Sequence, residues 1–233
     1  MSTVAERPAW TVDPPYGDPG YRSTAKRAPH RPLVPMAPEL APTTGPVFGE
    51  GYADPEDADL TAGHAGEPIG QRINVSGRIL GSDGRPLAGQ LVEIWQCNAA
   101  GRYAHQGDQH PAPLDPNFTG AGRCLTDAEG RYRFRTIRPG AYPWRNHPNA
   151  WRPAHIHFSV FGRAFTERLV TQMYFPGDPL IPFDPVLRSI RDPKAQERLV
   201  SAFDWDSTEE EFALGFAFDV VVGGHLATPP DPA

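Results

Sequence analysis

The sequence predicts an all-β protein, an antiparallel β-sandwich with long ordered loops and one or two short helices. Pro (28) and Gly (23) make up more than a fifth of the 233 residues, a frequency that breaks long helices and punctuates turns. Several short segments rich in β-branched and aromatic residues are separated by turn signals, which is typical of a sandwich. The expected strands, in order, are residues 72–79, 91–97, 131–137, 154–161, 168–175 and 212–222.

Each element follows from a local pattern. The first strand alternates apolar and polar residues, and a turn at 81–86 separates it from the second, so the two should pair as a hairpin. One helix is expected over 193–203, with Asp192 as its N-cap and Pro193 in the first helical position, after a shorter turn at 184–185. That helix would pack on the sheet through Leu199, Val200 and Phe203.

The chain divides into three expected parts. Residues 1–70 form an N-terminal arm and an acidic loop, residues 71–223 the catalytic β-sandwich, and residues 224–233 a C-terminal tail. Residues 14–50 are typical of an arm lying across the body or a partner subunit, or else of a disordered segment; their scattered apolar side chains favour the arm. The sequence indicates no role for the acidic loop at 50–66 or for the tail.

Charge and cysteine content exclude several classes of protein. Lys and Arg number 22 against 28 Asp and Glu, and no basic stripe is present, so binding to nucleic acid or to an anionic membrane is not expected. No segment has the apolar length of a membrane span or a signal peptide, which predicts a cytoplasmic protein. Cys97 and Cys124 are expected to be reduced thiols, although a single bridge stays open, and Cys97 has either a packing role or an oxidation-sensitive one.

Two histidines and two tyrosines are the candidate metal-binding residues. His155 and His157 stand two positions apart in an expected strand, so both rings leave the same face. They form half of a metal site or a pair of half-exposed surface histidines. Tyr103 and Tyr142 lie in expected loops, where each either caps the core or offers a phenolate oxygen. Two phenolates with two imidazoles would favour ferric iron, because a phenol needs a strong Lewis acid to ionise at neutral pH.

Six motifs resemble those of the intradiol ring-cleaving dioxygenases, and the similarity extends from about Tyr16 to about Val222. The N-terminal segments 21–27 and 44–46 look like those of an iron-bearing β subunit in this family. The motifs are Trp95-Gln-x-Asn98, Gly101-Arg-Tyr103, Asp115-Pro-Asn-Phe118, Gly122-Arg-Cys-Leu-Thr-Asp127, Arg138-Pro-Gly-x-Tyr-Pro-Trp144 and Trp151-Arg-Pro-Ala-His-Ile-His157.

This resemblance implies a mononuclear non-haem Fe(III) site and a reaction in which a catecholic substrate is cleaved by O2 between its two hydroxylated carbons. It implies that the substrate displaces the Tyr142 phenolate, which then acts as a base, that Arg152 stabilises developing negative charge and that Gln172 orients the substrate. It also implies a homologous α subunit without iron ligands as partner in an (αβ)n assembly, with n left open. The implied iron ligands are Tyr103, Tyr142, His155 and His157, with solvent in a fifth position, and the implied substrate-binding residues are Tyr21, Arg27 and Trp144.

Three alternatives stay open from the residues. The chain could be a family member that cleaves catechol or hydroxyquinol instead of a carboxylated catechol. It could be a non-enzymatic binding module of the carboxypeptidase-regulatory type, since the hairpin at 77–89 and the turn at 127–132 resemble that module. It could be a cupin-like oxygenase, although Glu167 is the only acid within about a dozen residues after the histidine pair.

Overall fold

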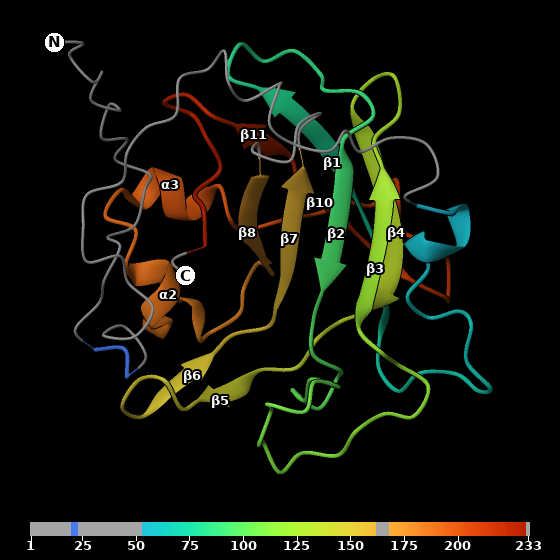
Figure 1. The fold of residues 1–233 in the computed structure, drawn as a ribbon, viewed down its shortest axis with the longest axis vertical. Helices are drawn as coiled ribbons and strands as arrows, with labels where there is room; N and C mark the ends of the chain where they lie inside the picture. The colour runs from blue at the N-terminus through green and yellow to red at the C-terminus, as the bar shows by residue number, and fades with distance from the viewer. Residues whose placement is uncertain (1–19, 23–52, 162–167, 232–233) are drawn as a thin grey trace, which may run out of the picture.

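The fold is two β-sheets packed face to face, with a small hairpin at one end and short helices at one side (Figure 1). The computed structural model describes residues 20–22, 53–161 and 168–231. The first sheet has the order β11-β1-β10-β9, with β4 paired to β1 as well; the second has the order β3-β2-β7-β8. The strands of the first sheet are β1 (Arg72–Gly81), β4 (Arg131–Ile137), β9 (Ala202–Phe203), β10 (Leu214–Ala217) and β11 (Val220–Val222).

The second sheet and the peripheral elements position the site. Strand β7 lies between β2 and β8 and pairs with both in antiparallel register. Within the described ranges, no helix has the length and apolar character needed to cross a bilayer. The strands of the second sheet are β2 (Leu91–Trp95), β3 (Ala121–Leu125), β7 (His155–Phe161) and β8 (Arg168–Tyr174). The peripheral elements are the hairpin β5 (Tyr142–Trp144) and β6 (Ala150–Arg152), the 3-10 turns η2 (Pro55–Ala58) and η3 (Ile181–Phe183), and the helices α2 (Pro185–Arg188) and α3 (Pro193–Glu197).

The core lies between the inner faces of the two sheets. Val75 on β1 and Phe134 on β4 face Ile94 on β2 and Phe158 on β7, and all four are at most 1% exposed. The rings of Phe134 and Phe158 meet edge to face at 5.7 Å between centroids, a favourable aromatic geometry. A smaller apolar cluster under the helices includes Leu199. The predicted sandwich class is therefore confirmed.

The strand expected over 212–222 is two strands separated by Phe218 and Asp219, and both run parallel to β1 in one continuous register. At the break, the amide of Phe218 donates to the Ser76 carbonyl at 2.8 Å. A Cβ at Gly77 would lie 1.9 Å from the Phe218 carbonyl oxygen, so only glycine permits this close approach. The first sheet is therefore mixed, although the other pairings in the two sheets are antiparallel. The predicted hairpin of the first two strands is wrong, because β1 and β2 lie in different sheets and the turn between them carries an isolated bridge from Leu80 to Pro86.

The expected helix over 193–203 is shorter than predicted, because it ends at Glu197. Asp192 is the N-cap as expected, and its carboxylate accepts from the Lys194 amide at 3.0 Å. After the helix, the backbone forms hydrogen bonds with the edge of β8 instead of continuing the helix. The amide of Tyr174 donates to the Leu199 carbonyl at 2.8 Å. Phe203 lies in β9 instead of the helix and is 49% exposed, and its ring contacts the sheet through Phe216 of β10 at 6.0 Å between centroids.

Both cysteines are free and buried, and Cys97 donates from its Sγ to the Gly140 carbonyl at 3.3 Å. Burial raises the pKa of each thiol to about 12. Because the thiolate is the nucleophile, we expect no labelling of the native protein by Ellman's reagent at pH 8 and two reactive thiols per chain in denaturant. Rapid labelling of Cys97 before unfolding would contradict its packing role.

Candidate metal centre

Two neighbouring loops bring the candidate tyrosines together. Tyr103 follows β2, and its amide donates to the Asp108 carboxylate at 2.8 Å. Tyr142 begins β5 and therefore lies in a short strand instead of the expected loop. The two segments touch at Gly101, which has a φ of 78° and where a Cβ would lie 2.4 Å from the Ala141 carbonyl oxygen. The tyrosine rings consequently meet edge to face at 5.6 Å between centroids.

Strand β7 supplies the two imidazoles from one face. The rings of His155 and His157 are 4.9 Å apart between centroids. The Nε2 atom of His155 lies 3.3 Å from the Tyr142 hydroxyl, and the Nε2 atom of His157 lies 3.2 Å from the Tyr103 hydroxyl. Two phenol oxygens and two imidazole nitrogens thus converge at one place.

The orientation of both imidazole rings is fixed by neighbours. The Nδ1 atom of His155 lies 2.7 Å from the Pro153 carbonyl oxygen, so it donates there and leaves Nε2 as the free lone pair. His157 pairs across the sheet with Trp95, and the two rings stack at 4.8 Å between centroids and 2° between planes. Each imidazole therefore presents Nε2 to the phenols, as a metal site requires.

Burial keeps these four side chains neutral without a cation. It raises the pKa of the Tyr103 phenol well above its ordinary value and raises the pKa of Tyr142 as well, although the nearby Arg152 charge opposes the second shift. It lowers the pKa of His155 well below 6.5 and lowers the pKa of His157. Neutral imidazoles are ready to bind a metal, and a strong Lewis acid would compensate the cost of two phenolates. The donor set therefore fits a trivalent ion.

The lowered histidine pKa values predict a stability profile for the metal-free protein. Below about pH 6.5 the histidines of the unfolded chain bind protons, whereas the buried imidazoles of the folded chain stay neutral. The free energy of unfolding should therefore decrease as the pH is lowered, by up to about 1.4 kcal/mol per pH unit for each imidazole. Urea denaturation at pH 7.5 and 5.5 measures this fall. His155→Gln should make it smaller, and an unchanged fall in that variant would contradict the assignment.

Arg152 ends strand β6 inside a buried polar network beside the imidazoles. Its Nε lies 2.9 Å from an Asp184 carboxylate oxygen, and its Nη2 donates to Gln172 and, at 3.0 Å, to the Tyr174 hydroxyl. That hydroxyl lies 2.7 Å from the other Asp184 oxygen. Burial alone would lower the pKa of Arg152, but Tyr174 and Asp184 raise it well above its usual value, so a fixed positive charge stands next to His155.

The residues expected to bind substrate are only partly described. Tyr21 is buried, and its ring meets Trp144 edge to face at 4.8 Å between centroids. Trp144 in turn lies under the Arg152 guanidinium at 5.6 Å. Gln172 pairs across the sheet with His157. Arg27 and most of the predicted arm lie outside the described residues, so their predicted roles stay predictions.

Several residues of this region were not identified from the sequence. Tyr174 and Asp184 complete the Arg152 network, Asp108 holds the Tyr103 loop, and Trp95 stacks on His157. Cross-strand register could have revealed Trp95, because antiparallel pairing places it opposite His157. Asp231, 3.4 Å from His157, carries no sequence signal at all.

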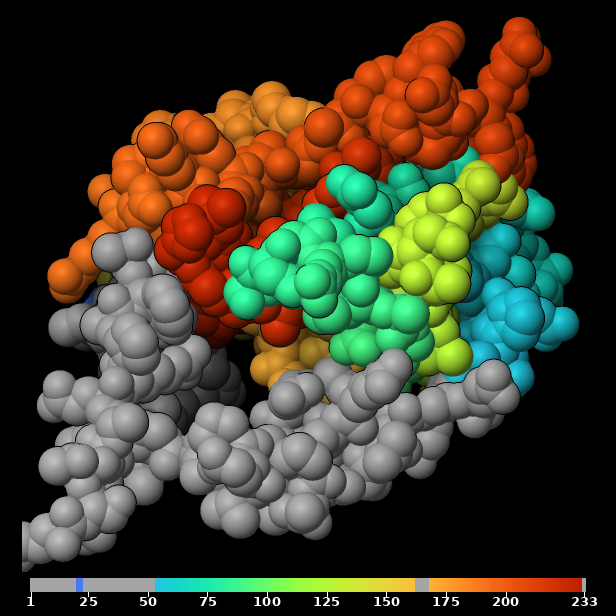
Figure 2. Space-filling model, turned by 90° about the horizontal axis from the view of Figure 1, so that it is seen from above, coloured from blue at the N-terminus to red at the C-terminus, as the bar shows by residue number. Residues whose placement is uncertain are grey.

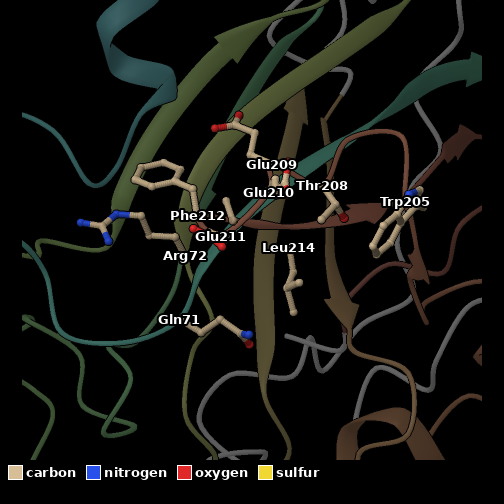
Figure 3. A pocket seen from close by; sticks show the side chains of 10 residues that line it. Gln71, Arg72, Trp205, Thr208, Glu209, Glu210, Glu211, Phe212 and Leu214 are labelled. Carbon is tan, nitrogen blue, oxygen red and sulfur yellow. The ribbon is translucent and has the colours of Figure 1, made fainter.

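A separate open pocket of about 690 Å³ lies where the start of β1 meets the segment 205–214 (Figure 3). It contains none of the predicted site residues. Its lining residues are Gln71, Arg72, Trp205, Thr208, Glu209, Glu210, Glu211, Phe212, Ala213 and Leu214.

Comparisons with known proteins give the same class as the fold and the site. A family model described as "Dioxygenase" matches residues 43–224, and one described as "Protocatechuate 3,4-dioxygenase beta subunit N terminal" matches residues 6–39. The protocatechuate 3,4-dioxygenase beta chain of Burkholderia cepacia is 58% identical over 222 residues, 94% of each chain. The hydroxyquinol 1,2-dioxygenase of Rhizobium sp. (strain MTP-10005) is 32% identical over 71% of this chain and 56% of its own length.

Among solved structures, the 3-chlorocatechol 1,2-dioxygenase of Rhodococcus opacus 1CP superposes with a TM-score of 0.55. It is 25% identical and is matched over 76% of this chain and 69% of its own. The β-sandwich with its tyrosine and histidine cluster is thus that of a ring-cleaving oxygenase. This chain belongs to the intradiol dioxygenase family, whose members use non-haem iron.

Proposed function

We propose that this chain is the iron-bearing subunit of a protocatechuate 3,4-dioxygenase. The enzyme cleaves 3,4-dihydroxybenzoate with O2 between its two hydroxylated carbons and forms 3-carboxy-cis,cis-muconate, a step of aromatic-compound catabolism in the cytoplasm through the β-ketoadipate pathway. The observation that carries this proposal is the near end-to-end match to a chain of that enzyme, 58% identical over 94% of both chains. The catechol and hydroxyquinol enzymes are more distant relatives.

In this proposal Tyr103, Tyr142, His155 and His157 hold a single ferric ion through their phenolate oxygens and Nε2 atoms. The distances of 3.2 and 3.3 Å between these donors support it. When bound, the ion would act as a Lewis acid toward the catechol diol and prepare the ring for reaction with O2.

The protein's own residues then manage protons and charge. The Tyr142 phenolate is the base that takes a proton from the substrate diol, and its nearness to the Arg152 charge makes its phenol easier to ionise than burial alone would allow. Arg152 stabilises the anionic ring electrostatically, since its charge is held in a buried place where water screens it little. Gln172, bound to Arg152, orients the substrate. Tyr21 and Arg27 approach the carboxylate side of the ring, and Trp144 contacts the substrate near the iron.

The proposed protein partner is a homologous α subunit that lacks the iron ligands and completes the substrate pocket in an (αβ)n assembly. Two observations support it. The relative that matches from end to end is named a beta chain, and residues 6–39 match a family model for the N terminus of that subunit.

The test is to co-express this chain with its α subunit and to incubate the product with protocatechuate, catechol or hydroxyquinol under O2. We expect a coloured iron protein that converts protocatechuate fastest, to a product carrying both atoms of O2 by mass spectrometry. An iron-loaded complex that leaves protocatechuate intact would contradict the proposal. Preferential conversion of catechol or hydroxyquinol would instead assign the chain to that branch of the family.

A further inference from the structure

The segment after β11 returns along the side of the sandwich and ends beside β8 and the helices (Figure 1); Figure 2 shows it, in red, against the turn between β1 and β2. Its backbone is fixed at several points. The Val221 amide donates to Thr228 Oγ1 at 2.9 Å, and Thr171 Oγ1 donates to the Pro229 carbonyl at 2.7 Å. The Asp231 amide donates to the Val170 carbonyl at 2.7 Å. The position of Asp231 is therefore set by pairing with β8.

The carboxylate of Asp231 faces the candidate metal centre. Its Oδ2 lies 3.4 Å from Nδ1 of His157, and the two side chains are only 18% and 12% exposed. That Nδ1 atom is buried and has no well-aligned hydrogen-bond partner among the described residues, so the Asp231 carboxylate at 3.4 Å is the acceptor within reach. The Gln172 side chain also helps to lower the pKa of this carboxylate, after its contact with His157. Asp231 thus joins His157 to the residues around Arg152.

The two imidazoles differ in what determines which ring nitrogen carries the proton. His155 donates its Nδ1 proton to the Pro153 carbonyl two residues earlier in the chain, so its tautomer is set locally. His157 has no such backbone acceptor in the described residues. Stacking on Trp95 restrains the plane of its ring but does not decide which nitrogen carries the proton. A group from elsewhere in the chain has to do that.

We propose that Asp231 is a positioning residue that accepts the Nδ1 proton of His157. The Nε2 lone pair then points toward the Tyr103 oxygen, 3.2 Å away, where the ferric ion would bind. Carboxylates in this position fix the tautomer of a ligating imidazole and increase its basicity. The inference rests on the proposed function, and it gives the C-terminal tail a defined role in holding the metal.

The test compares Asp231→Asn, Asp231→Ala and Asp231→Glu with wild type, in the full chain co-expressed with its α subunit. Loss of a partner of this kind typically weakens metal binding about 10- to 100-fold, so we expect Asn and Ala to speed iron loss to a chelator by that factor and Glu to restore part of it. The electron paramagnetic resonance signal and the tyrosinate charge-transfer band should shift in Asn and Ala. In the metal-free Asn and Ala variants, nitrogen NMR should show less of the His157 tautomer that is protonated at Nδ1 than in metal-free wild type.

Asp219→Asn is the matched control, because it removes the same charge from an exposed carboxylate that pairs with Arg78. It should leave iron loss and spectra unchanged. If Asn and Ala lower the melting temperature but keep the wild-type spectrum, tautomer and chelation rate, the tail has only a structural role and the inference is wrong. If wild type itself binds no iron, the proposed function fails instead, and the two failures are thereby distinguished.

Discussion

Tyr103→Phe and His155→Ala are each expected to lose most of the bound iron and to lower kcat/KM on the order of 1000-fold. Each change removes one of four donors, and Lewis-acid stabilisation is worth several kcal/mol, with each 1.36 kcal/mol equal to a factor of ten. Iron content by mass spectrometry and oxygen uptake with protocatechuate measure the two effects. The structure supports these two positions as ligands. The Tyr103 hydroxyl lies 3.2 Å from Nε2 of His157, and the His155 ring is oriented by the Pro153 carbonyl at 2.7 Å.

Tyr142→Phe should behave differently from these two variants. The family resemblance implies that substrate displaces this phenolate, so the variant should keep most of its iron and bind substrate more slowly. Tyr132→Phe is the matched control, because its buried hydroxyl donates to the Phe218 carbonyl in the sandwich core. It should cost about 0.5–1.5 kcal/mol of stability and no iron. Wild-type iron and turnover in Tyr103→Phe, His155→Ala and Tyr142→Phe together would refute the ligand assignment.

Most of the fold was predictable because its signals are local. Alternating strands and the Asp192 cap depend on neighbours in the sequence, and both were found where expected. The errors arose where a distant segment decides the outcome. The helix stops at Glu197 because the following backbone forms hydrogen bonds with β8, and the strand at 212–222 is interrupted where Phe218 approaches Gly77. The helix and strand propensities of these residues do not indicate that β8 or Gly77 will lie next to them.

The candidate site shows the same division. Tyr103, Tyr142, His155 and His157 were identified by residue chemistry and by motif, and the structure brings their donor atoms together. The residues that orient these four side chains were not predicted from the sequence. Asp231 lies in a proline-rich segment without a recognisable motif, so its pairing with β8 is what reveals a connection to His157. Supporting residues of this kind depend on tertiary register and leave no local pattern.

Asp184→Asn is expected to destabilise the fold by about 3–5 kcal/mol, the usual cost of leaving a buried charge without its partner. The side chains of Arg152 and Asp184 are 4% and 0% exposed, so water cannot replace the lost carboxylate. Asparagine keeps the shape of the side chain and can still cap α2, where Asp184 accepts from the Val186 amide. The loss should therefore come from the charge. Urea denaturation of the metal-free chain measures it.

Two further variants separate this effect from a general loss of charge. Asp219→Asn breaks the exposed pair with Arg78 and should change stability by no more than about 1 kcal/mol. Arg152→Met combined with Asp184→Asn removes the uncompensated cation and should recover a large part of the stability, while ring cleavage stays lost because the positive charge beside the substrate is gone. A double variant as unstable as Asp184→Asn alone would mean that the aspartate acts through the Tyr174 hydroxyl instead of through the guanidinium.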